Sequence, residues 1–129
     1  MDALSLGALV RSGELLQGQN FSGLDLAGAD LAGGTFEQCS FQGSNLAGAR
    51  LTEATFCECV LDDVDLSGAR LHQTTIDKSS LARAKLSAAT CTLLRCLDGD
   101  LRGAAFDEAD LRYAVFSKCR LDGVCFRAA

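Results

Sequence analysis

The chain has 129 residues, a length typical of one domain, and its apolar content of 48% excludes an intrinsically disordered chain. Its formal net charge of −5 argues against direct nucleic-acid binding, which requires a basic surface. No apolar run is long enough to cross a membrane, and no basic segment followed by an apolar stretch indicates a secretory signal.

Seven cysteines, an odd number, are spread along the chain without the paired spacing of a metal site. Cys57 and Cys59 form one close pair, and no matching second pair follows at the distance that a zinc site requires. Free thiols that pack as small apolar side chains are typical of a reducing compartment. We therefore expect a cytoplasmic protein with no metal and no cofactor.

Residues 1–15 are predicted to form a cap segment, and residues 16–129 a repeat domain. Asp2 is a typical residue for the start of a helix, and Leu6, Leu9 and Val10 follow it at helical spacing. Gly13 lies just beyond the expected end of this helix. Because a repeat rod must close its ends, we expect the short helix to cover the N-terminal end of the core.

From Leu16 onward an apolar residue recurs at every fifth position. All seven phenylalanines fall in this one phase, which random placement would produce with a chance of about 1 in 15,000. We call these residues centres and expect them to form one continuous core. After Leu16 they are Phe21, Leu26, Leu31, Phe36, Phe41, Leu46, Leu51, Phe56, Leu61, Leu66, Leu71, Ile76, Leu81, Leu86, Cys91, Cys96, Leu101, Phe106, Leu111, Phe116, Leu121 and Phe126.

The residues around each centre follow a pattern as well. The residue two places before the centre is small, as at Ala29, and Gly often stands two places after it, as at Gly33. A period of five fits neither a helix nor a flat strand. If each pentad forms one side of a square coil, the centre and the small residue point inward and Gly accommodates the corner. Four pentads then form one coil, and coils stack at about 4.8 Å.

Repeats such as Ala29-Asp30-Leu31-Ala32-Gly33 and Ser44-Asn45-Leu46-Ala47-Gly48 resemble those of the pentapeptide-repeat family. The resemblance covers about residues 14 to 129. It implies an all-β fold, a right-handed quadrilateral parallel β-helix. It also implies a protein that binds another macromolecule, and a dimer joined end to end.

The coil around residues 81–96 departs from the pattern. Two of its centres are the small residues Cys91 and Cys96, whereas Leu94 is the only large residue in the position two before a centre between Ala29 and Val124. We expect Leu94 to fill the space that the cysteines leave. The neighbouring Leu93 is then predicted to face outward. Either this leucine belongs to a contact site, or a local bulge turns one leucine inward.

Two regions are candidate interaction surfaces. Leu93 lies in the same outward column as Tyr113, one coil later. The last coil has no cap segment after it, so open strand edges and apolar side chains invite pairing with another chain. We therefore expect a homodimer formed through residues 106–129. The candidate interaction residues are Leu93, Leu97, Tyr113, Val124 and Phe126.

No residue cluster indicates catalysis. His72, the only histidine, is predicted to face outward without a cysteine, serine or carboxylate partner, so no catalytic, cofactor-binding or metal-binding residue is predicted. Residues 1–66 contain ten acidic and two basic residues, and residues 67–129 contain seven acidic and ten basic residues. A rod with a charge asymmetry and no reactive site favours a scaffold for protein–protein interaction, with a partner that the sequence does not identify.

Two alternatives stay open. Some members of the family, the quinolone-resistance proteins, mimic DNA and bind DNA gyrase or topoisomerase IV. Duplex DNA presents one charge per about 1.7 Å, and the acidic half of this chain offers such a density over only its first coils. The segment Ala8-Leu9-Val10-Arg11-Ser12-Gly13 is similar to segments that precede pentapeptide blocks in bacterial secretion-associated proteins, including type VI accessory proteins. That similarity implies an effector or accessory role.

Overall fold

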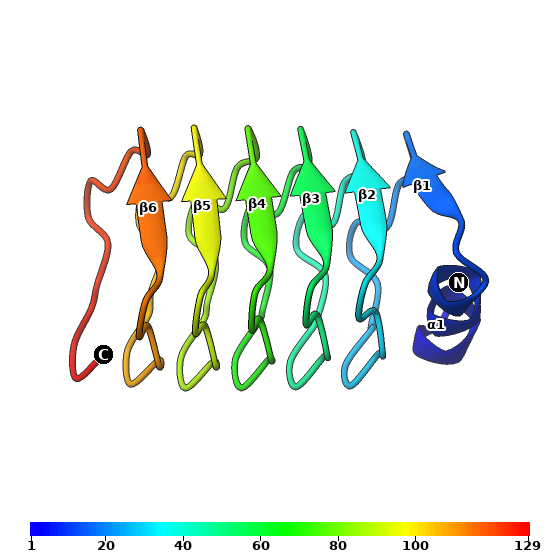
Figure 1. The fold of residues 1–129 in the computed structure, drawn as a ribbon, viewed down its shortest axis with the longest axis horizontal. Helices are drawn as coiled ribbons and strands as arrows, with labels where there is room; N and C mark the ends of the chain where they lie inside the picture. The colour runs from blue at the N-terminus through cyan, green and yellow to red at the C-terminus, as the bar shows by residue number, and fades with distance from the viewer.

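The chain forms a four-sided parallel solenoid closed at one end by a helix. The computed structural model describes residues 1–129. Its six strands pair in parallel and in chain order into one sheet that runs along the rod (Figure 1). The elements are α1 (Ala3–Arg11), β1 (Leu15–Gln17), β2 (Thr35–Glu37), β3 (Thr55–Cys57), β4 (Thr75–Asp77), β5 (Arg95–Leu97) and β6 (Val115–Ser117).

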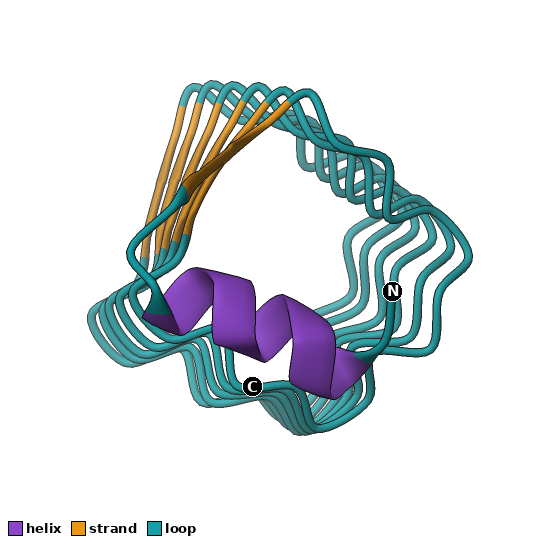
Figure 2. Cartoon of the chain, turned by 90° about the vertical axis from the view of Figure 1, so that its right-hand side faces the viewer, coloured by secondary structure: helices purple, strands orange, loops and turns teal.

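The predicted fold class, a parallel β-helix with a short N-terminal helix, is confirmed. Leu16 pairs with Phe36, and Phe36 pairs with Phe56, so each coil takes 20 residues. The view along the rod shows the four-sided outline of the coils (Figure 2). None of the helical structure has the length and hydrophobicity that a membrane crossing requires.

We number the four faces of the coil in chain order by their centres. Face 1 carries the strands. The centres of face 1 are Leu16, Phe36, Phe56, Ile76, Cys96 and Phe116. The bridges that flank the other centres define the remaining columns. These are Phe21, Phe41, Leu61, Leu81, Leu101 and Leu121 on face 2; Leu26, Leu46, Leu66, Leu86, Phe106 and Phe126 on face 3; and Leu31, Leu51, Leu71, Cys91 and Leu111 on face 4.

Backbone hydrogen bonds join successive coils on all four faces. Of 85 backbone–backbone hydrogen bonds, 70 lie outside the helix and the strands proper. On face 2, for example, the N–H of Phe41 donates to the carbonyl of Val60 at 2.7 Å, and the N–H of Val60 donates to the carbonyl of Cys39 at 3.0 Å. Parallel pairing of this kind therefore holds the rod together even where the strands are too short to be recognised as such.

The polar residue before the centre closes a turn. The side-chain oxygen of Asn45 accepts a hydrogen bond from the N–H of Ala47 at 3.0 Å, and Asp100 accepts one from the N–H of Arg102 at 3.1 Å. Both arrangements are Asx turns, in which a short side chain satisfies a backbone donor two residues later. This requirement explains why Asp and Asn recur at that position.

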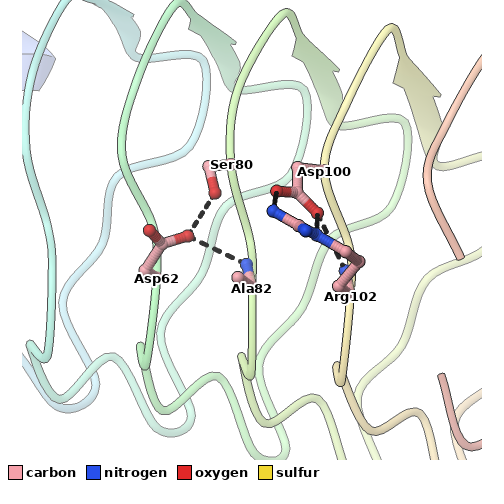
Figure 3. Close-up of polar contacts among 5 residues, drawn as sticks. All are labelled: Asp62, Ser80, Ala82, Asp100 and Arg102. Carbon is pink, nitrogen blue, oxygen red and sulfur yellow. Dashed lines mark hydrogen bonds and ion pairs between the residues drawn. The ribbon is translucent and has the colours of Figure 1, made fainter. Parts of the chain in front are cut away.

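A neighbouring coil supplies the acceptor at one pentad that lacks Asp or Asn. Ser80 stands before the centre there, and the carboxylate of Asp62, one coil earlier, accepts a hydrogen bond from the N–H of Ala82 at 2.9 Å. The hydroxyl of Ser80 donates to the same carboxylate oxygen (Figure 3). The turn at this pentad therefore depends on the stacking of two coils.

The helix α1 covers the N-terminal end of the coils (Figure 2). The carboxylate of Asp2 accepts a hydrogen bond from the N–H of Ser5 at 2.8 Å, which satisfies one free donor of the first turn. Leu6 and Val10 are buried against the core, and Leu9 is half-buried. Residues beyond the last turn of α1 lead into β1.

All centres from Phe21 to Phe106 are buried, so the four columns of side chains form one continuous apolar core. The last four predicted core residues are less enclosed. Leu111 and Phe116 are half-buried, and Leu121 and Phe126 are 40% and 42% exposed. The difference arises because no coil among the described residues stacks on the C-terminal side of these four.

Candidate protein-docking face

The irregular sequence of residues 81–96 forms a regular coil. β5 keeps the register, with Ile76 paired to Cys96 and Cys96 to Phe116. Leu94 is fully buried, as are the two small centres Cys91 and Cys96. No bulge forms here, because a large inward residue and small centres together occupy the space that a small residue and large centres occupy in other coils.

Large apolar side chains remain exposed beside this coil. Leu93 is 40% exposed, Val115 is 47% exposed and Tyr113 is 81% exposed. Leu93 and Tyr113 follow each other in the outer column at the corner between faces 4 and 1. Val115 begins β6 on the other side of the same corner. An exposed apolar cluster of this kind is typical of a contact surface.

These side chains surround a hollow of about 340 Å³. Its lining residues are Gln73, Thr75, Leu93, Arg95, Tyr113 and Val115. Leu97, at the end of β5, is half-buried on the same face. We call the surface formed by Leu93, Arg95, Leu97, Tyr113 and Val115 the docking face.

The backbone under two of these side chains is unfavourable for them. Leu93 has a φ of 60° and Tyr113 a φ of 61°, in the left-handed region. Gly33 occupies the same column with a φ of 71°. A bulky residue in this region is uncommon, because its Cβ crowds the backbone. Glu53 and Gln73 have the same conformation in this column, so the backbone is a property of the corner, and Leu93 and Tyr113 differ from them in being apolar and exposed.

Arg95 is the one charged residue that lines the hollow. The four ion pairs of the chain join Arg50 to Asp30, Arg83 to Asp63, Arg102 to Asp100, and Arg112 to Asp110. None of them involves Arg95. The apolar hollow is therefore bordered by a guanidinium group that has no carboxylate partner within the chain.

A second hollow, of about 590 Å³, lies at the corner between faces 1 and 2. One wall is a column of exposed residues that alternate in charge, and the other includes Arg120. The alternating residues are Glu58, Lys78, Asp98 and Lys118. Because positive and negative side chains are mixed along it, this hollow attracts neither anions nor cations selectively.

Three of the predicted interaction residues come together, and two lie elsewhere. Leu93, Leu97 and Tyr113 belong to the docking face, around β5 and β6. Val124 is half-buried, and Phe126 stacks on Phe106 with ring centroids 5.5 Å apart on face 3, opposite the strands. The last two therefore belong to a separate surface at the C-terminal end.

Sequence reasoning missed Arg95 and Val115. Both stand directly before a centre of face 1, the position that Thr35, Thr55 and Thr75 occupy in earlier coils. Comparison of residues 20 apart shows the change from threonine to arginine and valine. That signal was present in the sequence, but it becomes meaningful only when the two corner columns are known to be adjacent.

The cysteines and the histidine have no arrangement typical of a nucleophile and its base. All seven cysteines are free thiols. Burial raises the pKa of the Cys91 thiol to about 12 and the pKa of the Cys59 thiol to about 11, so both stay protonated near neutral pH. The Nδ1 atom of His72 lies 2.6 Å from the hydroxyl of Thr92, in the next coil.

The charges are distributed almost evenly among the faces. Face 1 carries five acidic and three basic residues, and face 2 carries four acidic and three basic residues. Face 3 carries four acidic and two basic residues, and face 4 carries three of each. The net charge of a face is thus between 0 and −2. No face is continuously acidic along the rod, as a surface that imitates duplex DNA would have to be.

Comparisons with known proteins agree with this architecture. The family profile described as pentapeptide repeats matches eight copies, in residues 20–56, 39–77 and 98–127. The chain belongs to the pentapeptide-repeat family. Among curated protein sequences, none matches this pentapeptide-repeat chain.

Two solved structures are similar to this pentapeptide-repeat chain. One is a pentapeptide repeat protein from the thylakoid lumen of Arabidopsis thaliana, 30% identical, with a TM-score of 0.76 over 82% of this chain and 73% of that one. The other is QnrB1, a plasmid-mediated fluoroquinolone resistance protein, 14% identical, with a TM-score of 0.69 over 86% of this chain and 71% of that one. At that identity the likeness to QnrB1 shows the fold alone.

The docking face adjoins the part of the chain where the repeat pattern is weakest. Residues 78–97 lie outside the matched segments, and they include Leu93, Arg95 and Leu97. The fold tolerates this departure, since the coil keeps its register. The unusual residues are therefore compatible with the fold but are not required by it.

Proposed function

We propose that this pentapeptide-repeat chain is a non-enzymatic scaffold that mediates protein–protein interaction through the docking face. The observation that carries the proposal is the exposure of the apolar side chains of Leu93, Tyr113 and Val115 around one hollow. Neither Leu93 nor Tyr113 supports the core, and both carry a conformational cost of about 1–2 kcal/mol. A contact with a partner accounts for their presence.

The test uses a variant that removes the contact groups and keeps the backbone. Leu93→Gly together with Tyr113→Gly suits the positive φ at both sites. The matched control is Glu53→Gly with Gln38→Gly, because these exposed residues also have a positive φ but do not line the hollow. The partner is sought by affinity capture from a native lysate with each protein as bait.

We expect a defined protein that is retained by the wild type and the control but lost by the docking-face variant. We also expect the free energy of unfolding of the docking-face variant to stay within about 1 kcal/mol of the wild type, because Gly relieves strain where apolar burial is lost. Equal retention of every captured protein by both variants would contradict the proposal.

The scaffold is also proposed to form a homodimer through residues 106–129. Leu121 and Phe126 expose apolar surface there. Four acidic and four basic residues make this segment neutral overall, so two copies meet without net repulsion. The proposed location remains the cytoplasm, where free thiols persist.

The two other functions receive less support. A topoisomerase-binding DNA mimic requires a continuous acidic face, and the charges on the four faces argue against this function. Inhibition of gyrase supercoiling by the purified protein would support it. A secretion-associated role rests on the loose similarity of residues 8–13, and no structural feature favours it. Neighbouring secretion genes in the genome would support it.

A further inference from the structure

We infer that the docking face binds an acidic segment of a partner protein, with an aliphatic or aromatic side chain seated in the hollow and a neighbouring carboxylate paired with Arg95. The inference rests on the proposed docking function and adds the chemistry of its partner. It is carried by the juxtaposition of an unpaired guanidinium with an apolar hollow.

The apolar part of the site requires an apolar side chain. Leu93, Tyr113 and Val115 present their surfaces to one hollow of about 340 Å³, which exceeds the volume of a single leucine or phenylalanine side chain. Tyr113 contributes an aromatic wall that is 81% exposed in the free chain. Burial of such surface by a partner side chain drives association, and aromatic residues are frequent at the centres of interfaces.

The charged part of the site favours a partner that carries an acidic residue next to this apolar side chain. Arg95 is exposed and forms no ion pair, whereas Arg83, Arg102 and Arg112 are each paired with an aspartate. Its neighbours in the column, Thr75 and Val115, are neutral. An arginine binds a carboxylate in a two-pronged geometry, and this pairing strengthens when an apolar contact beside it excludes water.

The wider charge distribution acts only weakly in the same direction. Residues 67–129, which contain the docking face, hold ten basic and seven acidic residues. Lys118, on the far side of the strand face, also forms no ion pair. Because Asp98 precedes Lys118 in the same column, that edge is mixed in charge, and the preference for an acidic segment rests on Arg95.

The experiment compares two blocked peptides that differ only in charge. They are acetyl-Asp-Leu-Phe-Asp-amide and its neutral analogue acetyl-Asn-Leu-Phe-Asn-amide. Each is titrated into the full ¹⁵N-labelled chain, and the amide shifts of the docking face are followed by NMR. We expect both to shift docking-face signals, with a Kd about twofold to fivefold lower for the acidic peptide at low salt.

Two variants separate the charge from the hollow. In Arg95→Gln the preference for the acidic peptide should vanish while the neutral peptide binds as before. In Arg127→Gln, which removes a similarly exposed charge from face 3, the preference should persist. Circular dichroism spectra like that of the wild type verify that both variants are folded.

The possible outcomes test the acidic preference and the docking site separately. Equal affinity for both peptides overturns the acidic chemistry and leaves the docking function standing. A preference for the acidic peptide that survives in Arg95→Gln overturns the role of Arg95. Absence of any shift at the docking face overturns the inference and the proposed site together. A fall in molecular mass in the Leu93→Gly/Tyr113→Gly variant would show that a second copy occupies this face, and it also overturns the inference.

Discussion

At the scale of single residues, the corners of the coil impose one backbone conformation on many side-chain types. The residue two places after each of the 23 centres has a positive φ, and fourteen of these residues are not glycine. An L-residue in this region costs about 1–2 kcal/mol. Stacking must offset this cost at every such corner, so the rod tolerates local strain that an isolated turn would not.

Ala88 offers a direct measurement of that strain. Its φ is 57°, and Ala88→Gly should raise the free energy of unfolding by about 1 kcal/mol. Gly28 lies in the same column with a φ of 69°, and a Cβ there would meet nothing within 4 Å. Gly28→Ala should therefore lower stability by about 1 kcal/mol through backbone conformation alone. Both are measured by urea unfolding.

Ala27 supplies the control because it lies outside the positive-φ positions. There, Ala27→Gly should destabilise the chain, since glycine increases the entropy of the unfolded state. If Ala88→Gly were as destabilising as Ala27→Gly, the assignment of strain at the corners would be wrong.

Asp100 connects a turn to the pH dependence of stability. The guanidinium and backbone N–H of Arg102 donate hydrogen bonds to its carboxylate and lower its pKa to about 2. The unfolded pKa is about 3.9, so the ionised carboxylate stabilises the fold above pH about 4. This contribution is lost as the pH falls from about 4 towards 2.

Asp100→Asn keeps an oxygen that can accept the hydrogen bond of the turn but removes the titrating group. Wild type should therefore exceed this variant in stability at pH about 5, and the difference should shrink at pH about 2.5. Arg102→Gln should weaken the same pH dependence, because the guanidinium is the main cause of the low pKa. An unchanged difference between the two pH values would contradict this assignment. Urea unfolding followed by circular dichroism supplies the values.

At the scale of elements, the coil that contains β5 shows how packing adapts to an irregular sequence. Leu94 is buried where other coils place small residues such as Ala54, and Cys96 stands where they place large centres such as Phe56. The two substitutions compensate each other in volume. The backbone can therefore keep its register while the outward residues of the coil change.

A double-mutant cycle tests this compensation. Leu94→Ala should lower the free energy of unfolding by about 2–5 kcal/mol because it leaves a cavity. Cys96→Ile alone should cost about 1–3 kcal/mol through overpacking. The double variant approaches the coil of Thr74 and Ile76, so its cost should be smaller than the sum of the two single costs. Strict additivity would mean that the two side chains do not share one space.

At the scale of the whole molecule, the two ends of the rod differ. The helix α1 covers the N-terminal end, and the last coil exposes Leu121 and Phe126. The acidic half adjoins the covered end, and the half with excess positive charge carries both the docking face and the exposed coil. Both proposed interaction surfaces thus lie in the second half of the chain.

We expect the chain to sediment and scatter light as a dimer, with twice the chain mass of 13.5 kDa. Leu121→Asp with Phe126→Asp should yield a monomer, because burial of a carboxylate at the interface is unfavourable. Leu93→Gly with Tyr113→Gly should stay dimeric, because these residues lie on a different surface. A wild type that remains monomeric at high concentration would exclude this interface.

The fold and the buried interior could be predicted from the spacing of residues along the chain. Residues five apart occupy the middle of successive faces of a square coil, and their side chains all point inward. The centres from Phe21 to Phe106 were therefore predictable as core from their spacing alone. The helix over residues 3–11 was predictable as an element from its N-terminal Asp2 and its apolar spacing. Both features are local, so the one-dimensional pattern contains them.

Contacts between side chains of different coils could not be predicted in this way, because they depend on how the coils stack. Arg95, Val115 and Tyr113 share a hollow with Leu93 because the columns on either side of a corner become neighbours only when coils stack in register. The hydrogen bond that the carboxylate of Asp62 accepts from the N–H of Ala82 depends on the same stacking. The regular coil around Leu94 likewise results from a balance of volumes among several side chains, which no single repeat specifies.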